Sequence, residues 1–139
     1  MGTVIRAKIS KKNKYWIDKH RYYELKHFCL QYKEWEKAYI ACGDYILPKT
    51  YMEESRKTNA INDVTSKCAV EMAYYAKHME MVEKAAMEAE PELYHYLLKA
   101  VTEGLSYTYL KTKLDIPCSR DMYYDRYRKF FWILSNSRD

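Results

Sequence analysis

The chain has 139 residues, of which 48% are hydrophobic and 31% charged, an ordinary balance for a small globular protein. Its net charge of +5 is moderate, so only the clustering of the basic residues favours nucleic acid over a role in solubility. No apolar run reaches membrane-spanning length and the basic N-terminus lacks a signal-peptide core, so we expect a cytoplasmic protein. Sixteen tyrosines against three phenylalanines favour either surfaces that bind a protein partner or nucleic acid, or a small, partly wet core.

The first 14 residues are basic. Arg6 and four lysines precede the first acidic residue, which is Asp18. We therefore expect residues 1–14 to form a flexible basic arm. Such an arm either follows a phosphate backbone or enters a groove, or it only increases solubility.

Two heptad patterns predict a long antiparallel helical hairpin over residues 15–90. The first helix is expected at about 18–42 and the second at about 63–90, joined by a linker over 43–61 that contains Gly43 and Pro48. The seam of the first helix comprises Leu25, Phe28, Tyr32, Trp35, Tyr39 and Cys42. The seam of the second comprises Cys68, Met72, Tyr75, Met79, Val82, Ala86 and Ala89. The large aromatic residues of the first seam are expected to pack on the small and flexible residues of the second.

A two-helix hairpin leaves apolar faces open. Trp35, Tyr39, Trp132 and Ile133 are therefore candidate interface residues, either in a homodimer or with another partner. The alternative is that the same apolar stripes form only a monomeric core.

Residues 91–139 predict three short helices. Pro91 suits the first position of a helix that ends at Glu103, before a left-handed Gly104. Ser106 can cap a second helix that runs to about Leu114. The expected fold is thus all-α, with the hairpin followed by a C-terminal three-helix unit that resembles a helix-turn-helix.

The third helix is expected from Arg120 to about Ser135, with Ser119 as its cap, after a turn of about four or five residues. Its inner stripe comprises Tyr123, Tyr127, Phe130 and Leu134, with Phe131 beside them. Arg126 and Lys129 are expected on other faces, where they either contact DNA or form a solvated surface.

A recognition helix docks on DNA by its N-terminal end and outer face. The candidate DNA-contacting residues are Lys111, Lys113, Ser119, Arg120, Tyr124, Arg126, Arg128 and Lys129. Asp121 and Asp125 argue against DNA contact, unless Asp121 stabilises the positive end of the helix and Asp125 pairs with Lys129.

Residues 97–134 contain EGLSY at 103–107, then Leu110, LDI at 114–116 and the basic aromatic helix. This stretch resembles the helix-turn-helix of sigma-factor region four and of phage late-gene regulators of the ArpU and RinA type. Two further segments, YYELKHFCLQY at 22–32 and IPCSRDMYYDRYRKFF at 116–131, resemble small prophage proteins of Gram-positive bacteria. The resemblance implies a bacterial host cell, double-stranded DNA as a partner and contact with RNA polymerase.

Lys111 and Thr112 stand where such units usually carry a small residue, so the unit either reads DNA in a divergent way or binds protein. Three functions follow as expectations. The first is a DNA-binding transcriptional regulator of a phage or prophage. The alternatives are a protein that inhibits a host defence nuclease or ribonucleoprotein, as an anti-CRISPR protein does, and a DNA-packaging protein like a small terminase subunit.

The sequence shows no pattern that is typical of a metal site, a cofactor site or an enzyme active site. Cys29, Cys42, Cys68 and Cys118 are widely spaced, and no histidine stands at zinc-finger spacing. With three glycines there is no phosphate-binding loop, and no nucleophile motif is present. We therefore expect no metal, no cofactor and no enzyme activity.

Overall fold

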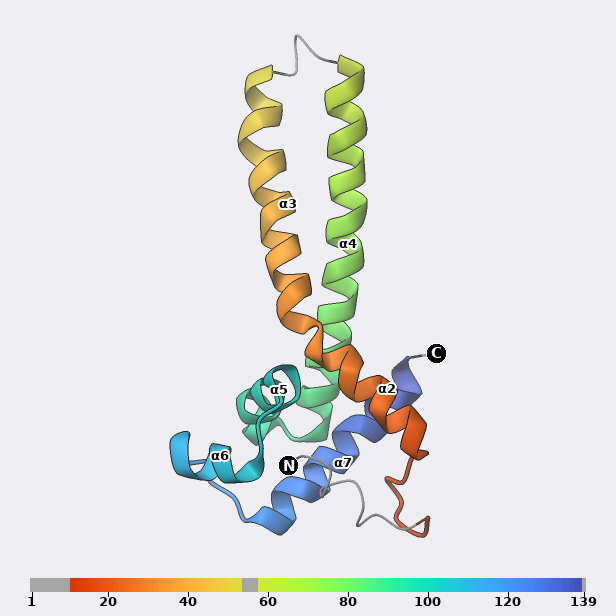
Figure 1. Cartoon of the computed structure of the whole chain (residues 1–139), viewed down its shortest axis with the longest axis vertical. Helices are drawn as coiled ribbons and strands as arrows, with labels where there is room; N and C mark the ends of the chain where they lie inside the picture. The colour runs from red at the N-terminus through yellow and green to blue at the C-terminus, as the bar shows by residue number, and fades with distance from the viewer. Residues whose placement is uncertain (1–10, 54–57, 139) are drawn as a thin grey trace. The chain divides into compact units, whose positions relative to one another are not determined.

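The computed structural model describes residues 11–53 and 58–138, with the backbone alone at 45–53 and 58–64. Within these residues the regular structure is helical, without a strand, which confirms the all-α class (Figure 1). The elements are α2 (Lys19–Leu30), α3 (Tyr32–Glu53), α4 (Thr58–Ala89), a 3-10 turn (Pro91–Leu93), α5 (Tyr94–Glu103), α6 (Tyr107–Lys113) and α7 (Arg120–Ser137).

The chain divides into two compact units. The first unit comprises Met1–Gln31 and Met81–Asp139, and the second comprises Tyr32–Glu80. The division differs from the expected one, because α2 packs against α5 and α7 instead of extending the hairpin. Residues 1–10 of the predicted arm lie outside the described residues.

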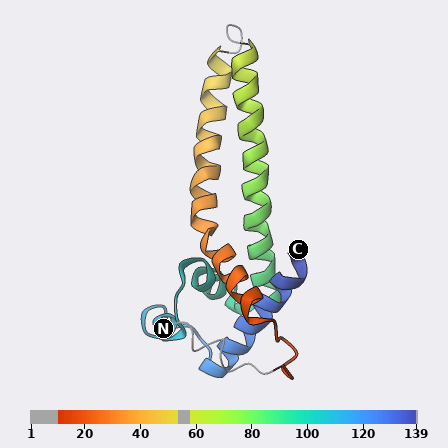
Figure 2. The same ribbon diagram turned by 45° about the vertical axis from the view of Figure 1, so that its right-hand side comes forward.

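The second unit is an antiparallel helical hairpin of α3 and the larger part of α4 (Figures 1 and 2). The ring centroids of Trp35 and His78 lie 5.2 Å apart. Further along α3, the Cys42 thiol lies 3.7 Å from Glu71. Because a later residue of α3 meets an earlier residue of α4, the two helices run in opposite directions, as the heptad patterns predict.

The predicted linker over 43–61 is wrong in extent. Helix α3 continues to Glu53 and α4 begins at Thr58, so both Gly43 and Pro48 lie within a helix. Glycine and proline disfavour a helix interior, but packing between helices overrides such local preferences. At Gly43 a Cβ atom would lie 3.6 Å from the Met72 side chain, an ordinary packing distance.

The single helix predicted over 18–42 is also wrong, because it is interrupted at Gln31. Asp18 caps α2 by accepting the N–H of His20 at 3.0 Å, and the helix ends at Leu30. The N–H of Gln31 bonds to the Phe28 carbonyl at 3.2 Å, which tightens the last turn. The apolar stripe that is continuous in the sequence is therefore divided between two compact units.

The C-terminal helices of the first unit begin and end close to the predicted residues. Gly104 adopts a left-handed conformation (φ 71°), and the N–H of Leu105 closes the helix end on the Ala100 carbonyl. Pro91 begins a 3-10 turn rather than α5 itself, which starts at Tyr94. The predicted inner stripe of α7 is buried, and its members are Tyr123, Tyr127, Phe130, Phe131 and Leu134.

The turn between α6 and α7 occupies residues 114–119, slightly longer than predicted. Asp115 adopts a left-handed conformation (φ 54°), and Ile116 after it is fully buried. The Tyr107 hydroxyl donates to the Cys118 carbonyl at 2.6 Å. The burial of Ile116 and the hydrogen bond from Tyr107 to Cys118 thus hold the turn at two points.

Candidate nucleic-acid interface

The start of α7 is exposed at Ser119, Arg120 and Asp121. Ser119 caps this end, because its Oγ accepts the N–H of Met122 at 3.2 Å. The positive end of the helix dipole and the exposed Ser119 favour a nearby anion. The exposed Asp121 in the first turn offsets part of this potential.

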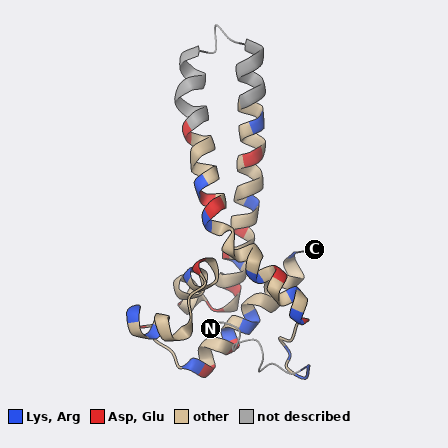
Figure 3. Cartoon of the chain, viewed as in Figure 1, with Lys and Arg blue, Asp and Glu red and all other residues tan. Residues whose placement is uncertain are grey.

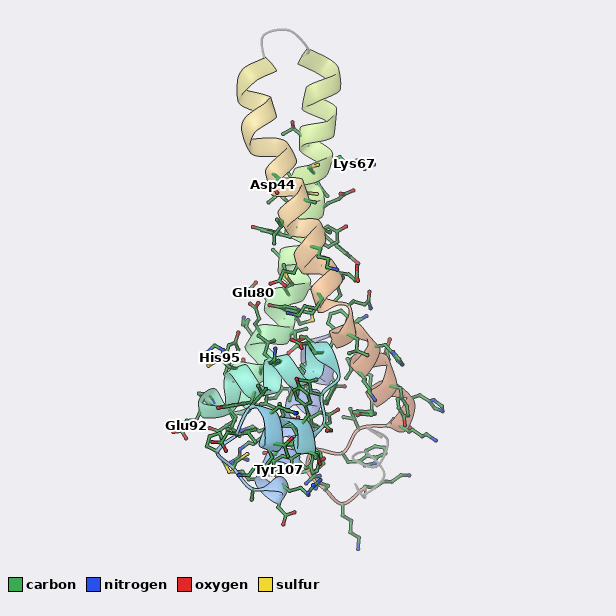
Figure 4. The ribbon with its side chains drawn as sticks, turned by 60° about the vertical axis from the view of Figure 1, so that its left-hand side comes forward. Asp44, Lys67, Glu80, Glu92, His95 and Tyr107 are labelled. Carbon is green, nitrogen blue, oxygen red and sulfur yellow. The ribbon has the colours of Figure 1, made fainter. Side chains whose placement is uncertain are left out.

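At the same place Arg120 lies against two tyrosine rings that also contact each other, with their centroids 6.2 Å apart. Its guanidinium carbon is 5.0 Å from the centroid of Tyr107 and 5.9 Å from that of Tyr124. Its Nη1 and Nη2 atoms lie 3.5 Å from the Tyr124 hydroxyl and from the Thr108 hydroxyl. We call Arg120, Tyr107, Thr108 and Tyr124 the Arg120 cluster; Figure 4 labels Tyr107 at the start of α6.

The Arg120 cluster orders a cation without neutralising it. Tyrosine rings attract a guanidinium through their quadrupole, but they carry no opposite charge. The side chain of Arg120 remains exposed, so its N–H groups are accessible to an acceptor. A guanidinium held in this way is suited to bidentate contact with phosphate or with a guanine edge.

Lys111 and Lys113 are both exposed on α6. Lys111 follows Tyr107 by four residues and Thr108 by three, so it lies on the same side of α6 as the Arg120 cluster. Lys113 follows Lys111 by two residues, about 200° around the helix, so it lies on a different side of α6. The structure therefore places Arg120 against Tyr124 and next to Ser119, with Lys111 on the side of α6 that carries Tyr107 and Thr108.

Arg126, predicted as a DNA-contacting residue, pairs with two carboxylates within the first unit. Its Nε donates to the Glu90 carboxylate at 2.9 Å, and its Nη1 donates to Asp125. The hydrogen bond to Glu90 raises the pKa of Arg126 above its ordinary value. Asp125 thus pairs with Arg126 instead of the predicted Lys129, and Arg126 ties α7 to the residue that follows α4.

Arg128 and Lys129 are half-buried on α7. The Nε atom of Arg128 is buried without a hydrogen-bond partner. Arg128 follows Tyr124 by one helical turn, whereas Lys129 lies about 100° further around the helix. Only Arg128 of this pair extends the side of α7 that carries Arg120 and Tyr124.

The four candidate interface residues have different environments. Trp35 is only 6% exposed and packs against His78, so it belongs to the core rather than to a free surface. Tyr39 is 36% exposed, and Ile133 is half-buried. Trp132 is 37% exposed, and its ring centroid lies 5.7 Å from that of Tyr15.

Sequence reasoning missed Tyr107 and Thr108 as site residues. Tyr107 directly follows the Ser106 cap, so its place at the start of α6 was readable. Its approach to Arg120 depends on the path of the turn at 114–119, for which no local pattern exists.

Two wider observations concern the whole described part of the chain. No group of three or more His, Cys, Asp or Glu side chains in it is arranged to hold a metal ion. No helix among these residues combines the length and apolar character needed to cross a membrane.

No protein-family model matches the sequence, and neither curated proteins nor solved structures give a significant match.

Proposed function

We propose that this chain is a double-stranded DNA-binding transcriptional regulator of a phage or prophage, acting in the bacterial cytoplasm. The observation that carries the proposal is the Arg120 cluster at the start of α7. In a helix-turn-helix, this end of the recognition helix enters the major groove while neighbouring residues hold phosphates. The helical hairpin would then serve dimerisation or contact with RNA polymerase.

The proposed contacts divide into two kinds. Arg120 reads a base edge, because its guanidinium is both ordered and accessible. Lys111, Ser119 and Arg128 contact phosphates and so position the helix without reading sequence. Arg126 has a structural part in this arrangement through its ion pair with Glu90.

One observation favours a different function. Asp121 is exposed on α7, and Asp125 lies one turn further along the same side. Carboxylates on the outer face of α7 repel phosphates but attract a basic protein. They favour the alternative in which the unit binds a host defence nuclease or ribonucleoprotein as an inhibitor.

Fluorescence anisotropy with duplex fragments of the protein's own genetic element, against random duplex, tests the proposal. We expect one fragment to bind preferentially, and Arg120→Ala to weaken that binding by about 1–3 kcal/mol. Arg120→Lys keeps the charge but loses the planar donor geometry, so it should recover affinity more than sequence preference. Lys67→Ala, a change on α4 in the second unit (Figure 4), is the matched control.

Equal binding of all fragments by the unaltered protein would reject the proposal. The proposal also fails if Arg120→Ala keeps the full preference for one fragment. In either case, a protein partner would become the favoured explanation of the exposed surface of α7.

A further inference from the structure

A second basic surface lies in the first unit, where the segment before α2 runs beside α7 (Figures 1 and 2). The segment is folded onto the unit. The Asn13 side chain accepts the N–H of Tyr15 at 2.8 Å, and the Asn13 carbonyl accepts that of Trp16 at 3.0 Å. Tyr15 packs on Trp132 of α7, and Ile17 is 9% exposed. We call residues 11–16 the basic turn.

Three exposed lysines give the basic turn its charge. The ammonium of Lys11 lies 5.8 Å from the Trp16 ring centroid, and that of Lys14 lies 5.1 Å from the Tyr15 ring centroid. Lys12 stands between them in the sequence. The rings restrict the two ammonium groups without neutralising them, as the tyrosines do for Arg120.

Nearby carboxylates have other roles. Asp18 caps α2 through its bond to the N–H of His20. Asp125 on α7 is bound to Arg126. The charge of the basic turn is therefore not cancelled by an ion pair within the described part of the segment. Figure 3 shows Lys and Arg on this segment and along α7.

The basic turn has a defined position relative to the Arg120 cluster, because both are attached to α7. Trp132 follows Arg120 by 12 residues, which corresponds to about 18 Å along the helix axis. The major groove of B-DNA is about 12 Å wide. This separation exceeds the groove width, so a helix that enters the groove by its start leaves the basic turn outside the groove, within reach of the flanking phosphates.

We propose that the basic turn binds the phosphate backbone of the duplex that flanks the sequence contacted by α7, and that Trp132 positions it there. This inference rests on the proposed DNA-binding function and adds a second contact surface to it. It predicts that the lysines contribute to affinity through counterion release, without contributing to sequence preference.

The test is the salt dependence of binding to the preferred duplex. Replacing Lys11, Lys12 and Lys14 together with Ala should reduce the slope of log affinity against log salt by about 2 to 3, since each lost phosphate contact removes about 0.9. The ratio between preferred and random duplex should stay the same. The matched control replaces three exposed lysines of the second unit with Ala, namely Lys37, Lys67 and Lys77.

A second variant tests the role of Trp132 without changing the charge. Trp132→Ala removes the ring on which Tyr15 packs, and we expect a several-fold loss of DNA affinity at physiological salt. Helical circular dichroism and the thermal midpoint establish that the variant is folded. Tyr15→Ala removes the same contact from the other side and should have a similar effect.

The outcomes separate the two proposals. If Arg120→Ala loses sequence preference while the triple lysine variant keeps the original slope, this inference fails and the proposed function stands. If the unaltered protein has no preferred duplex, the proposed function fails. If the basic turn binds polyglutamate as strongly as random duplex, it is a generic polyanion surface, and the inference is overturned.

Discussion

The buried hydroxyl of Tyr123 gives a sharp test of the packing in the first unit. Tyr123 is fully buried, and its hydroxyl has no hydrogen-bond partner. Burial also raises its pKa, so the hydroxyl stays protonated. A buried polar group without a partner costs about 1–3 kcal/mol. Tyr123→Phe removes the hydroxyl and keeps the ring, so we expect stability to rise by about 1 kcal/mol.

Tyr127→Phe is the matched comparison, because it removes a hydroxyl that is bonded. The Tyr127 and Tyr22 hydroxyls lie 2.8 Å apart in the core. Losing this bond should lower stability by about 1 kcal/mol. The double change Tyr22→Phe and Tyr127→Phe should recover most of the loss, since both polar groups leave the core together.

Urea unfolding followed by circular dichroism measures these effects. The midpoint should rise for Tyr123→Phe and fall for Tyr127→Phe, with an unchanged dependence on urea. In thermal unfolding, a change of 1 kcal/mol corresponds to a shift of about 4 °C for a chain of this size. If Tyr123→Phe lowers stability by as much as Tyr127→Phe does, the Tyr123 hydroxyl is satisfied and the reasoning is refuted.

Three further predictions concern stability. Gly104→Ala should cost about 1 kcal/mol, because φ is 71° there while the Cβ itself meets no clash; an unchanged urea midpoint would contradict this. Arg126→Ala should cost about 1 kcal/mol, since it leaves the Glu90 carboxylate, 16% exposed, without its ion pair; a stability equal to that of the unaltered protein would show the pair to be superficial. Stability should fall between pH 9 and pH 11, because burial and the nearby Cys68 raise the pKa of Cys42 from 9.0 to about 11 in the folded state. In this interval the unfolded state binds fewer protons than the folded state, so rising pH favours unfolding. Urea midpoints measured across the interval check the sign. Cys42→Ser should make the fall shallower without removing it, because burial also raises the pKa values of Cys29, Tyr123 and Tyr127.

Features determined by a few neighbouring residues were predictable from the sequence. Ser106 and Ser119 cap α6 and α7 as predicted, because an N-cap depends on one side chain and the N–H groups that follow it. Gly104 ends α5 because glycine accepts the left-handed conformation. The inner stripe of α7 followed from the helical period alone.

The interruption at Gln31 and the extent of α3 were not predictable in the same way. No glycine or proline stands at Gln31, and the apolar period continues through it. The helix ends there, and the segments before and after it belong to different compact units. Conversely, Gly43 and Pro48 indicate a break that the hairpin does not make. Both errors arise where tertiary packing outweighs local preference.

The different environments of the candidate site residues also depend on tertiary packing. Arg120 and Arg126 are both arginines on α7, and the sequence gives them equal weight. Their partners distinguish them, because Arg120 meets tyrosine rings whereas Arg126 meets the carboxylates of Glu90 and Asp125. Those partners come from other turns and helices, so only the structure separates the exposed cation from the structural one.

Three of the tyrosines acquire a physical role from this contrast. A carboxylate that holds a cation also cancels its charge, whereas a ring holds the cation and leaves its charge available to an anion. Tyr107 and Tyr124 do this for Arg120, and Tyr15 does it for Lys14. If the rings serve this purpose, replacing Tyr124 with Glu should keep Arg120 in place and still abolish preferential DNA binding.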